Sequence, residues 1–300
     1  MEEVNCDLCG RDAPSPLFKR KDRFSGQEYQ IVSCSNCGFI YLNPRPSPEE
    51  LPEHYPSDYE AYYLLNDHSS SRNQWHLQRA LNLQLNFIQQ YASSRGRLLD
   101  VGCATGNFLK VGRDNGWQVV GVEPIEEAAK IAREYYQLNV FTGTLDSVDL
   151  EDDLFDVITM WDVLEHLPSP TNALLRSHHL LKPDGLLVFS IPNLSSFDRY
   201  LFGKHWIGWD APRHFNLFTE ESLTQLMENT GFKLLARKCI IGGKGTFLLS
   251  MDNFIKDKKL GSIVKSSYPV ISALLWPYRQ ISYLLKRGPI ITYAIQKKGD

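Results

Sequence analysis

The chain has 300 residues, of which 43% are hydrophobic and 22% are charged, and its formal net charge is -3 at pH 7. This length allows two domains, and the composition is typical of a globular chain that buries a core. The slightly acidic charge, without a long basic run, disfavours nucleic acid as a partner. The sequence has neither a transmembrane-length apolar run nor a secretory signal, so we expect a cytoplasmic protein.

Residues 1–45 contain four of the six cysteines, as two C-x-x-C pairs that are each followed directly by glycine. These are Cys6, Cys9, Cys34 and Cys37. Two-residue spacing lets a tight turn direct both sulfurs at one ion, and four thiolates complete a tetrahedral zinc site with no open position. We therefore predict a structural zinc module; the alternatives are unliganded thiols or a redox pair. Cys103 and Cys239 are expected to be core residues.

Residues 46–92 are expected to form a tyrosine-rich connector followed by a helix around Trp75–Tyr91, because leucines recur there at helical spacing. From Arg97 onward, buried-strand runs alternate with helical runs. Strands are expected at 97–103, 118–124, 139–143, 155–161, 185–191, 232–241 and 289–297, and helices at 107–116, 125–136, 170–181 and 219–230. This alternation predicts a doubly wound α/β domain over residues 93–300, with a mostly parallel sheet.

The run LLDVGCATGNFL connects the first of these strands to the first helix through the small residues Gly102–Gly106. Small residues let the backbone approach a ligand at the carboxyl edge of the sheet, where the N–H groups of a helix converge. The next strand ends in Glu123, whose carboxylate can accept hydrogen bonds from both hydroxyls of a ribose. A glycine turn alone is often only a turn, but its combination with this acid predicts a nucleoside site. The absence of G-K-S/T excludes a P-loop.

The runs DVGCATGNF and VEP resemble the first two motifs of class I S-adenosylmethionine-dependent methyltransferases. FDVITMWDVLEHLPSP and LKPDGLLVFSIPN resemble later motifs of the small-molecule subgroup, which includes ubiquinone-type O-methyltransferases. The cysteine module resembles an N-terminal zinc region that is fused to such domains in many bacterial enzymes. The resemblance spans about residues 6–240. It implies a Rossmann-like methyltransferase fold with a seven-stranded sheet, a zinc-ribbon-like module, S-adenosyl-L-methionine as cofactor and structural Zn2+.

The resemblance also implies roles for individual residues. Asp100 would shape the pocket around the methionine part of the cofactor, Glu123 would hold the ribose, and Pro124 would lie beside the adenine. Met160 and Trp161 would close over the cofactor. The complete implied set is Asp100, Gly102, Cys103, Ala104, Gly106, Asn107, Phe108, Glu123, Pro124, Thr144, Leu145, Met160 and Trp161.

The contact to the adenine amino group departs from the family pattern. Thr144 and Leu145 occupy the position that often carries an acid in relatives. Asp146, the next residue, is the substitute that this sequence offers.

Methyl transfer to a hydroxyl requires a base near the cofactor. Asp162, Glu165 and His166 follow the fourth strand at i, i+3, i+4 spacing, so they would share a face if a helical turn starts there. His166 is the first candidate base because histidine titrates near neutrality, and the alternative is that it only packs or caps a turn. Asp162 is a second catalytic candidate. The resemblance also implies a possible divalent cation at Asp162, Glu165 and His166.

Residues 194–218 form a long aromatic-rich segment between the fifth strand and the next helix. A loop of this length is usually functional, and we expect a substrate lid over the carboxyl edge of the sheet. Trp209, Arg213 and His214 are the predicted acceptor-binding residues, and His214 is also a candidate catalytic residue. The alternative is that the aromatic residues are core and that Arg213 is a structural ion-pair partner.

Residues 245–288 are expected to be a helical insertion before the last strand. Its part 262–288 mixes apolar with basic residues, and could be a second lid, a dimer surface or a helix in peripheral contact with a membrane. Pro269 and Pro277 are expected to interrupt any long helix, which favours a lid or a dimer surface. The chain could be a monomer or a homodimer.

These features favour an S-adenosylmethionine-dependent methyltransferase that acts on a small molecule, on oxygen. The acceptor would be a sugar, a glycan precursor, or an isoprenoid-like or phenol-like compound. The first alternative is an RNA or protein methyltransferase that uses the zinc module for recognition, although few basic residues flank the cysteines. The second is a non-catalytic S-adenosylmethionine-binding protein, which would have little use for both the glycine turn and Glu123.

Overall fold

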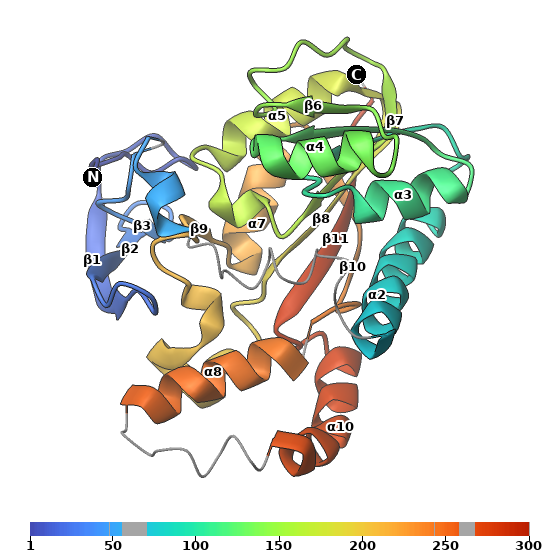
Figure 1. Ribbon diagram of the computed structural model, residues 1–300. Helices are drawn as coiled ribbons and strands as arrows, with labels where there is room; N and C mark the ends of the chain where they lie inside the picture. Colours follow the sequence, from blue (N-terminus) through green and yellow to red (C-terminus); the bar gives the residue numbers. More distant parts are fainter. Residues whose placement is uncertain (48, 56–70, 243, 258–267, 300) are drawn as a thin grey trace. The chain divides into compact units, whose positions relative to one another are not determined.

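The computed structural model describes residues 1–47, 49–55, 71–242, 244–257 and 268–299 (Figure 1). Their strands form a seven-stranded and a four-stranded sheet. The order of the larger sheet is β10-β11-β8-β7-β4-β5-β6. Its strands are β4 (Arg97–Val101), β5 (Gln118–Glu123), β6 (Val140–Thr142), β7 (Phe155–Trp161), β8 (Leu181–Pro192), β10 (Phe232–Lys238) and β11 (Ile290–Lys297).

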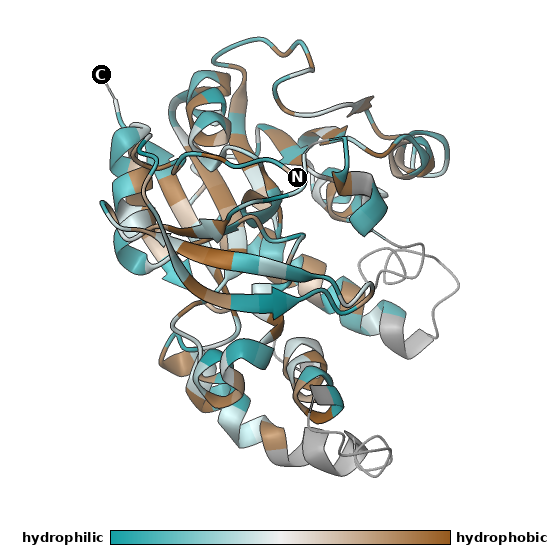
Figure 2. Ribbon diagram, turned by 90° about the vertical axis from the view of Figure 1, so that its left-hand side faces the viewer, coloured by the Kyte–Doolittle hydropathy of each residue, from teal (hydrophilic) through white to brown (hydrophobic). Residues whose placement is uncertain are grey.

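The centre of the larger sheet is parallel, as the alternating pattern predicts. β4 pairs in parallel with β5 and β7, β5 with β6, and β7 with β8. The crossovers contain α3 (Asn107–Asp114), α4 (Glu126–Glu134) and α5 (Pro170–Leu180), and α7 (Glu220–Asn229) precedes β10. Leu98, Leu99 and Ile158 have no exposed surface, as expected for strands covered on both faces. Apolar residues colour the strands brown in Figure 2. The predicted seven-stranded, mostly parallel α/β fold is confirmed.

The smaller sheet combines the cysteine module with the predicted lid. Its antiparallel order is β1 (Pro14–Lys21), β2 (Glu28–Cys34), β3 (Ile40–Leu42) and β9 (Asn216–Leu217). The lid also contains α6 (Phe197–Phe202) and the short 3-10 helices η3 (Gly203–His205) and η4 (Ile207–Trp209). Trp206, Trp209 and Phe215 are buried together with Tyr29 and Leu42 in one apolar cluster. Most of the lid aromatics therefore form core, which was the alternative interpretation.

The other helices of the described residues are η1 (Leu51–His54), α2 (Ser71–Gln89), η2 (Leu164–His166), α8 (Lys244–Asp257) and α10 (Tyr268–Leu284). The expectation that prolines interrupt a long helix before the last strand is wrong, because α10 continues for 17 residues with Pro277 inside it. Proline removes one N–H from the helical ladder, and Pro277 is exposed beside Trp276, where its ring lies on the solvent side. None of the described helices combines the length and apolar character needed to cross a bilayer.

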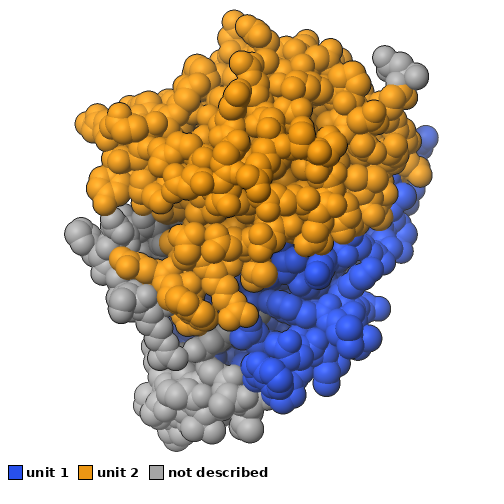
Figure 3. Space-filling view, turned by 90° about the vertical axis from the view of Figure 1, so that its right-hand side faces the viewer, with its two compact units in different colours: residues 1–55, 191–224, 237–291 blue, residues 56–190, 225–236, 292–300 orange. Residues whose placement is uncertain are grey.

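The chain divides into two compact units (Figure 3). Unit 1 comprises Met1–Tyr55, Ile191–Thr224 and Arg237–Ile291, and unit 2 comprises Pro56–Ser190, Gln225–Ala236 and Thr292–Asp300. This division differs from the expected boundaries at residues 45 and 92, because the cysteine module groups with the lid and the helical insertion.

Candidate functional site

The four cysteines of the N-terminal module converge in unit 1. The Sγ atoms of Cys6 and Cys37 lie 3.5 Å apart, and those of Cys9 and Cys34 lie 3.6 Å apart. All four sulfurs lie within 4.8 Å of one another. Tetrahedral zinc with Zn–S bonds of about 2.3 Å separates its sulfurs by about 3.8 Å. All four cysteines are free thiols rather than disulfides, so this donor set fits the predicted structural zinc ion.

The turn after β4 requires glycine at both of its ends. Gly102 and Gly106 have φ values of 69° and 81°, where an L side chain is strained. A Cβ on Gly102 would lie 2.6 Å from Val163 Cγ2, and one on Gly106 would lie 2.6 Å from Leu138 Cδ1. Gly106 is also the residue that caps the start of α3. The turn therefore brings bare backbone to the N-terminus of a helix, as a nucleoside site requires.

Glu123, at the end of β5, is bonded to this turn. Its Oε2 accepts the Ala104 N–H at 2.8 Å, and its Oε1 accepts the Ile125 N–H at 2.9 Å. Burial raises the pKa of Glu123, and these two hydrogen bonds oppose that rise. A carboxylate has about four lone-pair sites, so about two remain for the hydroxyls of a ribose. The acid therefore lies where the sequence predicts it, and its free lone pairs fit a nucleoside.

Asp100 is buried near the end of β4, and its hydrogen-bond partner, Thr159, is not among the predicted site residues. The Thr159 hydroxyl, on the neighbouring strand β7, donates to Asp100 Oδ1 at 2.6 Å. Burial raises the pKa of Asp100 to about 7; the bond from Thr159 lowers it, and the charge of Glu123 raises it. The signal that could have identified Thr159 is its position as a polar residue inside the apolar run FDVITMW.

Trp161 leaves a polar group available beside this turn. Its ring contacts the Phe108 ring edge-on, with centroids 5.2 Å apart. Within the described residues its buried Nε1 has no hydrogen-bond partner, and a buried donor normally has one. Asn107, by contrast, accepts the Tyr136 hydroxyl at 3.1 Å. The indole N–H is therefore available to a ligand acceptor.

The remaining residues of the predicted cofactor set lie around the turn and on the following strands. Cys103, Met160 and Leu145 are buried. The Thr144 N–H donates to Ser147 Oγ at 2.8 Å, and Asp146 is exposed. Pro124 follows Glu123 directly, before α4. Their contacts with S-adenosylmethionine stay predictions.

The predicted acid–acid–histidine set follows β7, but not on one helical face. Asp162 has a φ of 54°, and the 3-10 turn η2 (Leu164–His166) begins only after it. The Asp162 N–H donates to Ser190 Oγ at 3.0 Å, and the Ser190 hydroxyl donates to Asp162 Oδ1 at 2.7 Å. Ligand atoms of Glu165 and His166 come within 4.8 Å of each other, but among the described residues Asp162 does not join them in a metal-binding group. Burial, and then the charge of Asp162, raise the pKa of Glu165 well above its usual range.

Arg213 has no exposed side-chain surface, and its guanidinium is fully engaged inside unit 1. Nε and Nη2 donate to Asp210, Nη2 donates to Asp22 at 2.8 Å, and Nη1 donates to the His54 carbonyl at 2.9 Å. These contacts match the alternative interpretation of Arg213 as an ion-pair partner. Its predicted acceptor-binding role is untested.

The other two predicted acceptor-binding residues also contact the protein itself. The Trp209 indole N–H donates to the Gly203 carbonyl at 3.0 Å, and Trp209 is 4% exposed. His214 Nδ1 lies 2.9 Å from the Gly208 carbonyl oxygen. Both roles likewise stay predictions.

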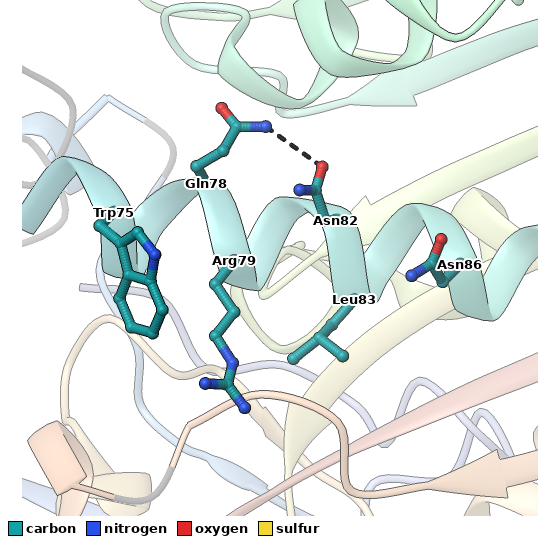
Figure 4. Close-up of a pocket in the computed structure, with 6 residues that line it drawn as sticks. All are labelled: Trp75, Gln78, Arg79, Asn82, Leu83 and Asn86. Atoms are coloured by element: carbon teal, nitrogen blue, oxygen red, sulfur yellow. Dashed lines mark hydrogen bonds between the residues drawn. The ribbon is translucent and has the colours of Figure 1, made fainter.

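A cavity of about 350 Å³ lies along α2 (Figure 4). It is lined by Trp75, Gln78, Arg79, Asn82, Leu83 and Asn86. The Gln78 side chain donates to Asn82 Oδ1 at 3.1 Å, and Arg79 is the one ionisable residue in the lining. Because this lining offers no nucleophile or base, the cavity adds nothing to the chemistry at the turn.

Comparison with known proteins agrees with this geometry. Residues 74–237 match a family described as methyltransferase domain. The ubiquinone biosynthesis O-methyltransferase of Actinobacillus pleuropneumoniae is 31% identical over 139 residues, which cover 42% of this chain and 59% of that protein. The enzyme of the same name from Coxiella burnetii is 31% identical over 166 residues, which cover 51% of this chain and 70% of that protein. The chain thus spans about three fifths of the first relative.

Two solved structures share the fold. The cyclase SpnF aligns with a TM-score of 0.52 at 19% identity, covering 86% of this chain and 99% of that one. A possible histamine N-methyltransferase from Thermotoga maritima aligns with a TM-score of 0.50 at 21% identity, covering 79% and 100%. At these identities the likeness shows the fold alone, and the two names differ in reaction.

A parallel sheet with a glycine turn after one strand, and a buried acid ending the next, defines a Rossmann-like, nucleoside-binding class of protein, and the family match narrows this class to the S-adenosylmethionine-dependent methyltransferases. The family match extends over more than half of the chain and includes the turn, Glu123 and the residues after β7. The chain belongs to the methyltransferase domain family, so the prediction of a methyltransferase is confirmed.

Proposed function

We propose that this protein transfers the methyl group of S-adenosylmethionine to a hydroxyl oxygen of a small-molecule acceptor. The observation that carries the proposal is the carboxylate of Glu123 on the turn that begins α3. The relatives from A. pleuropneumoniae and C. burnetii are both named as O-methyltransferases of ubiquinone biosynthesis, which supports oxygen as the acceptor atom. A phenol-like or isoprenoid-like acceptor is therefore favoured over a sugar or glycan precursor.

The reaction requires few chemical contributions from the protein. The sulfonium of the cofactor supplies an already activated methyl group, so the chain must align the acceptor, exclude water and remove one proton. Glu123 and the turn would hold the nucleoside. His166 is the proposed base, because a neutral imidazole can take the proton of a hydroxyl, and Asp162 and His214 are the alternatives. The cysteine module would act through a structural zinc ion, since four thiolates leave no open position.

A methyl-transfer assay with the purified protein and labelled S-adenosylmethionine tests the proposal. The acceptors are a panel of catechols, polyprenylphenols and sugar nucleotides. We expect labelled product, and stoichiometric S-adenosylhomocysteine, with a hydroxylated aromatic acceptor. Glu123→Gln should lose activity at limiting cofactor and recover part of it at high cofactor concentration. Cofactor binding without turnover on any acceptor, including cell extract, would support the non-catalytic alternative. Salt-sensitive methylation of RNA would support the macromolecular one.

A further inference from the structure

The helix α10 exposes large apolar side chains on one face. Trp276 is 63% exposed, Ile281 is 55% exposed and Leu284 is 81% exposed. At about 100° per residue, these positions fall within an arc of about 140°, so they share one half of the helix surface. Leu285, which directly follows the helix, is 54% exposed. Single exposed apolar residues are ordinary on a protein surface, but a contiguous stripe marks an interaction site.

The opposite face of α10 is packed within unit 1. The Tyr278 hydroxyl donates to Asp198 Oδ1 at 2.5 Å, and the Tyr278 ring contacts Phe197 and Phe247. Ser282 is 1% exposed. In Figure 1, α8 is the orange helix and α10 is the red-orange one. The packed face anchors the helix, so the apolar stripe of Trp276, Ile281 and Leu284 faces solvent in a fixed orientation.

This part of the chain also carries a concentrated positive charge. Residues 244–288 contain eight lysines and arginines and two aspartates, a net charge of +6 in a chain whose net charge is -3. Among the described residues, Lys286 is exposed next to Leu285, and the Lys256 side chain on α8 is 66% exposed. The segment lies outside residues 74–237, the part that matches the methyltransferase family. The family match therefore says nothing about this segment.

We propose that the exposed face of α10 rests on an anionic phospholipid bilayer. Trp276, Ile281 and Leu284 would enter the interfacial layer, and the exposed Lys286 beside the helix would face the lipid phosphates. An amphipathic helix with tryptophan and leucine on one side and basic residues beside them suits this layer.

The charge favours a bilayer over a second copy of the chain. In a two-fold dimer the same patch faces itself, so the exposed Lys286 next to the apolar residues would be brought toward its own copy, in a stretch of sequence whose net charge is +6. Like charges brought together across an interface oppose association, and lysine is depleted in interface cores. An anionic lipid surface instead attracts every basic residue that approaches it.

Vesicle sedimentation of the full chain tests this proposal. We expect binding to vesicles that contain about one-third phosphatidylserine, and binding weaker by about tenfold or more to pure phosphatidylcholine or at high salt. The double variant Trp276→Ser, Leu284→Ser should reduce binding to the anionic vesicles by a further tenfold or so, since both side chains would leave the apolar layer. Trp75→Ser is the matched control, because Trp75 is a similarly exposed tryptophan (56%) on α2.

A second readout locates the contact. Bromine-labelled lipids should quench part of the tryptophan fluorescence of the wild type and of Trp75→Phe. The quenched fraction should be smaller in Trp276→Phe, which lacks the tryptophan at the proposed contact but keeps an apolar side chain there. The proposal is overturned if the wild type ignores anionic vesicles, or if Trp75→Ser loses as much binding as the double variant. It is equally overturned if light scattering shows that the double variant converts a dimer to a monomer. Unchanged thermal melting would confirm that each variant is folded.

Discussion

At the scale of single residues, Glu123 links two neighbouring strands at the proposed cofactor site. It ends β5, and its carboxylate bonds to the backbone of the turn after β4. One side chain therefore holds the turn, and in the proposed function the same carboxylate would also bind a ribose. This double role means that a variant must be isosteric if the loss of charge is to be separated from the loss of packing.

We expect Glu123→Gln to weaken S-adenosylmethionine binding by about 1.5–3 kcal/mol, since a hydrogen bond to a charged group is lost, or about 10- to 100-fold in Kd. Isothermal titration calorimetry measures this. Glu126→Gln is the control, because Glu126 begins α4 three residues later and its interactions are with Thr142 and Arg133 at the surface. Equal affinities of wild type and Glu123→Gln would remove the ribose role.

Asp100 should give the ligand-free protein a pH-dependent stability. Its pKa is raised to about 7 in the folded protein and is about 3.9 in an unfolded chain. The folded state therefore binds the proton more tightly, so this stabilisation is complete below about pH 4 and is lost as the pH rises through about 7. The free energy of unfolding should fall over this window by about 3–4 kcal/mol more in the wild type than in Asp100→Asn. Urea titrations at several pH values measure it, and parallel curves for the two proteins would contradict the assignment.

At the scale of elements, the contacts of Arg213 hold together segments that are far apart in sequence. It bonds to Asp22 in the turn between β1 and β2, to Asp210 after η4, and to the carbonyl of His54 at the end of η1. Both carboxylates are buried. The Arg213 charge compensates both acids, so removing it would take the guanidinium from Asp22 and leave Asp210 with Arg23, whose Nε lies 3.4 Å from Asp210 Oδ1.

Arg213→Met should destabilise the protein by about 3–5 kcal/mol, the usual cost of breaking a buried ion pair by removal of one partner. Urea denaturation at neutral pH gives this value. Arg237→Met is the control: its pair with Glu220 is partly exposed, so its loss should cost about 1 kcal/mol or less. If Arg213→Met unfolds like the wild type and loses only acceptor affinity, Arg213 is an acceptor-binding residue instead.

The cysteine module makes a prediction about metal content. Purified protein should contain about one zinc per chain, as measured by inductively coupled plasma mass spectrometry. Cys6→Ser should reduce the zinc content and lower the Tm, because metal binding contributes to the stability of such modules. Cys239→Ser, at a buried cysteine outside the module, should keep its zinc. A metal-free preparation with an unchanged Tm would exclude the zinc site.

The sequence predicted those elements whose signal is local. The central strands β4, β7 and β8 contain short apolar runs, and the C-x-x-C pairs and the glycine turn are each contained in a few residues. The contacts it did not predict join distant positions, such as Asp22 with Arg213, which are 191 residues apart. The aromatic segment 194–218 has no periodicity that distinguishes a buried from an exposed tryptophan. The burial of Trp209 could therefore not be predicted from the sequence. The low helix propensity of proline led to the wrong prediction that Pro277 interrupts α10, because propensity takes no account of the position of Pro277 on the exposed side of the helix.

At the scale of the whole molecule, the two compact units are interleaved along the chain. Unit 1 takes three separate stretches, and unit 2 takes the intervening ones. The shared family region, residues 74–237, begins in unit 2 and includes the aromatic segment of unit 1. Neither unit is therefore a continuous segment that could be expressed alone, and the variants above are best made in the full chain.

The pairing of β3 with β9 has a consequence for the order in which the protein is made. Ile40 pairs with Leu217, so the edge of the cysteine module meets its partner strand only after more than half of the polypeptide has been translated. Until residues 194–218 have emerged from the ribosome, the apolar residues of β2 and β3 lack the aromatic side chains that later bury them. A nascent chain stalled before residue 216 would expose this edge, and chaperones that recognise unpaired strands would be expected to bind it there.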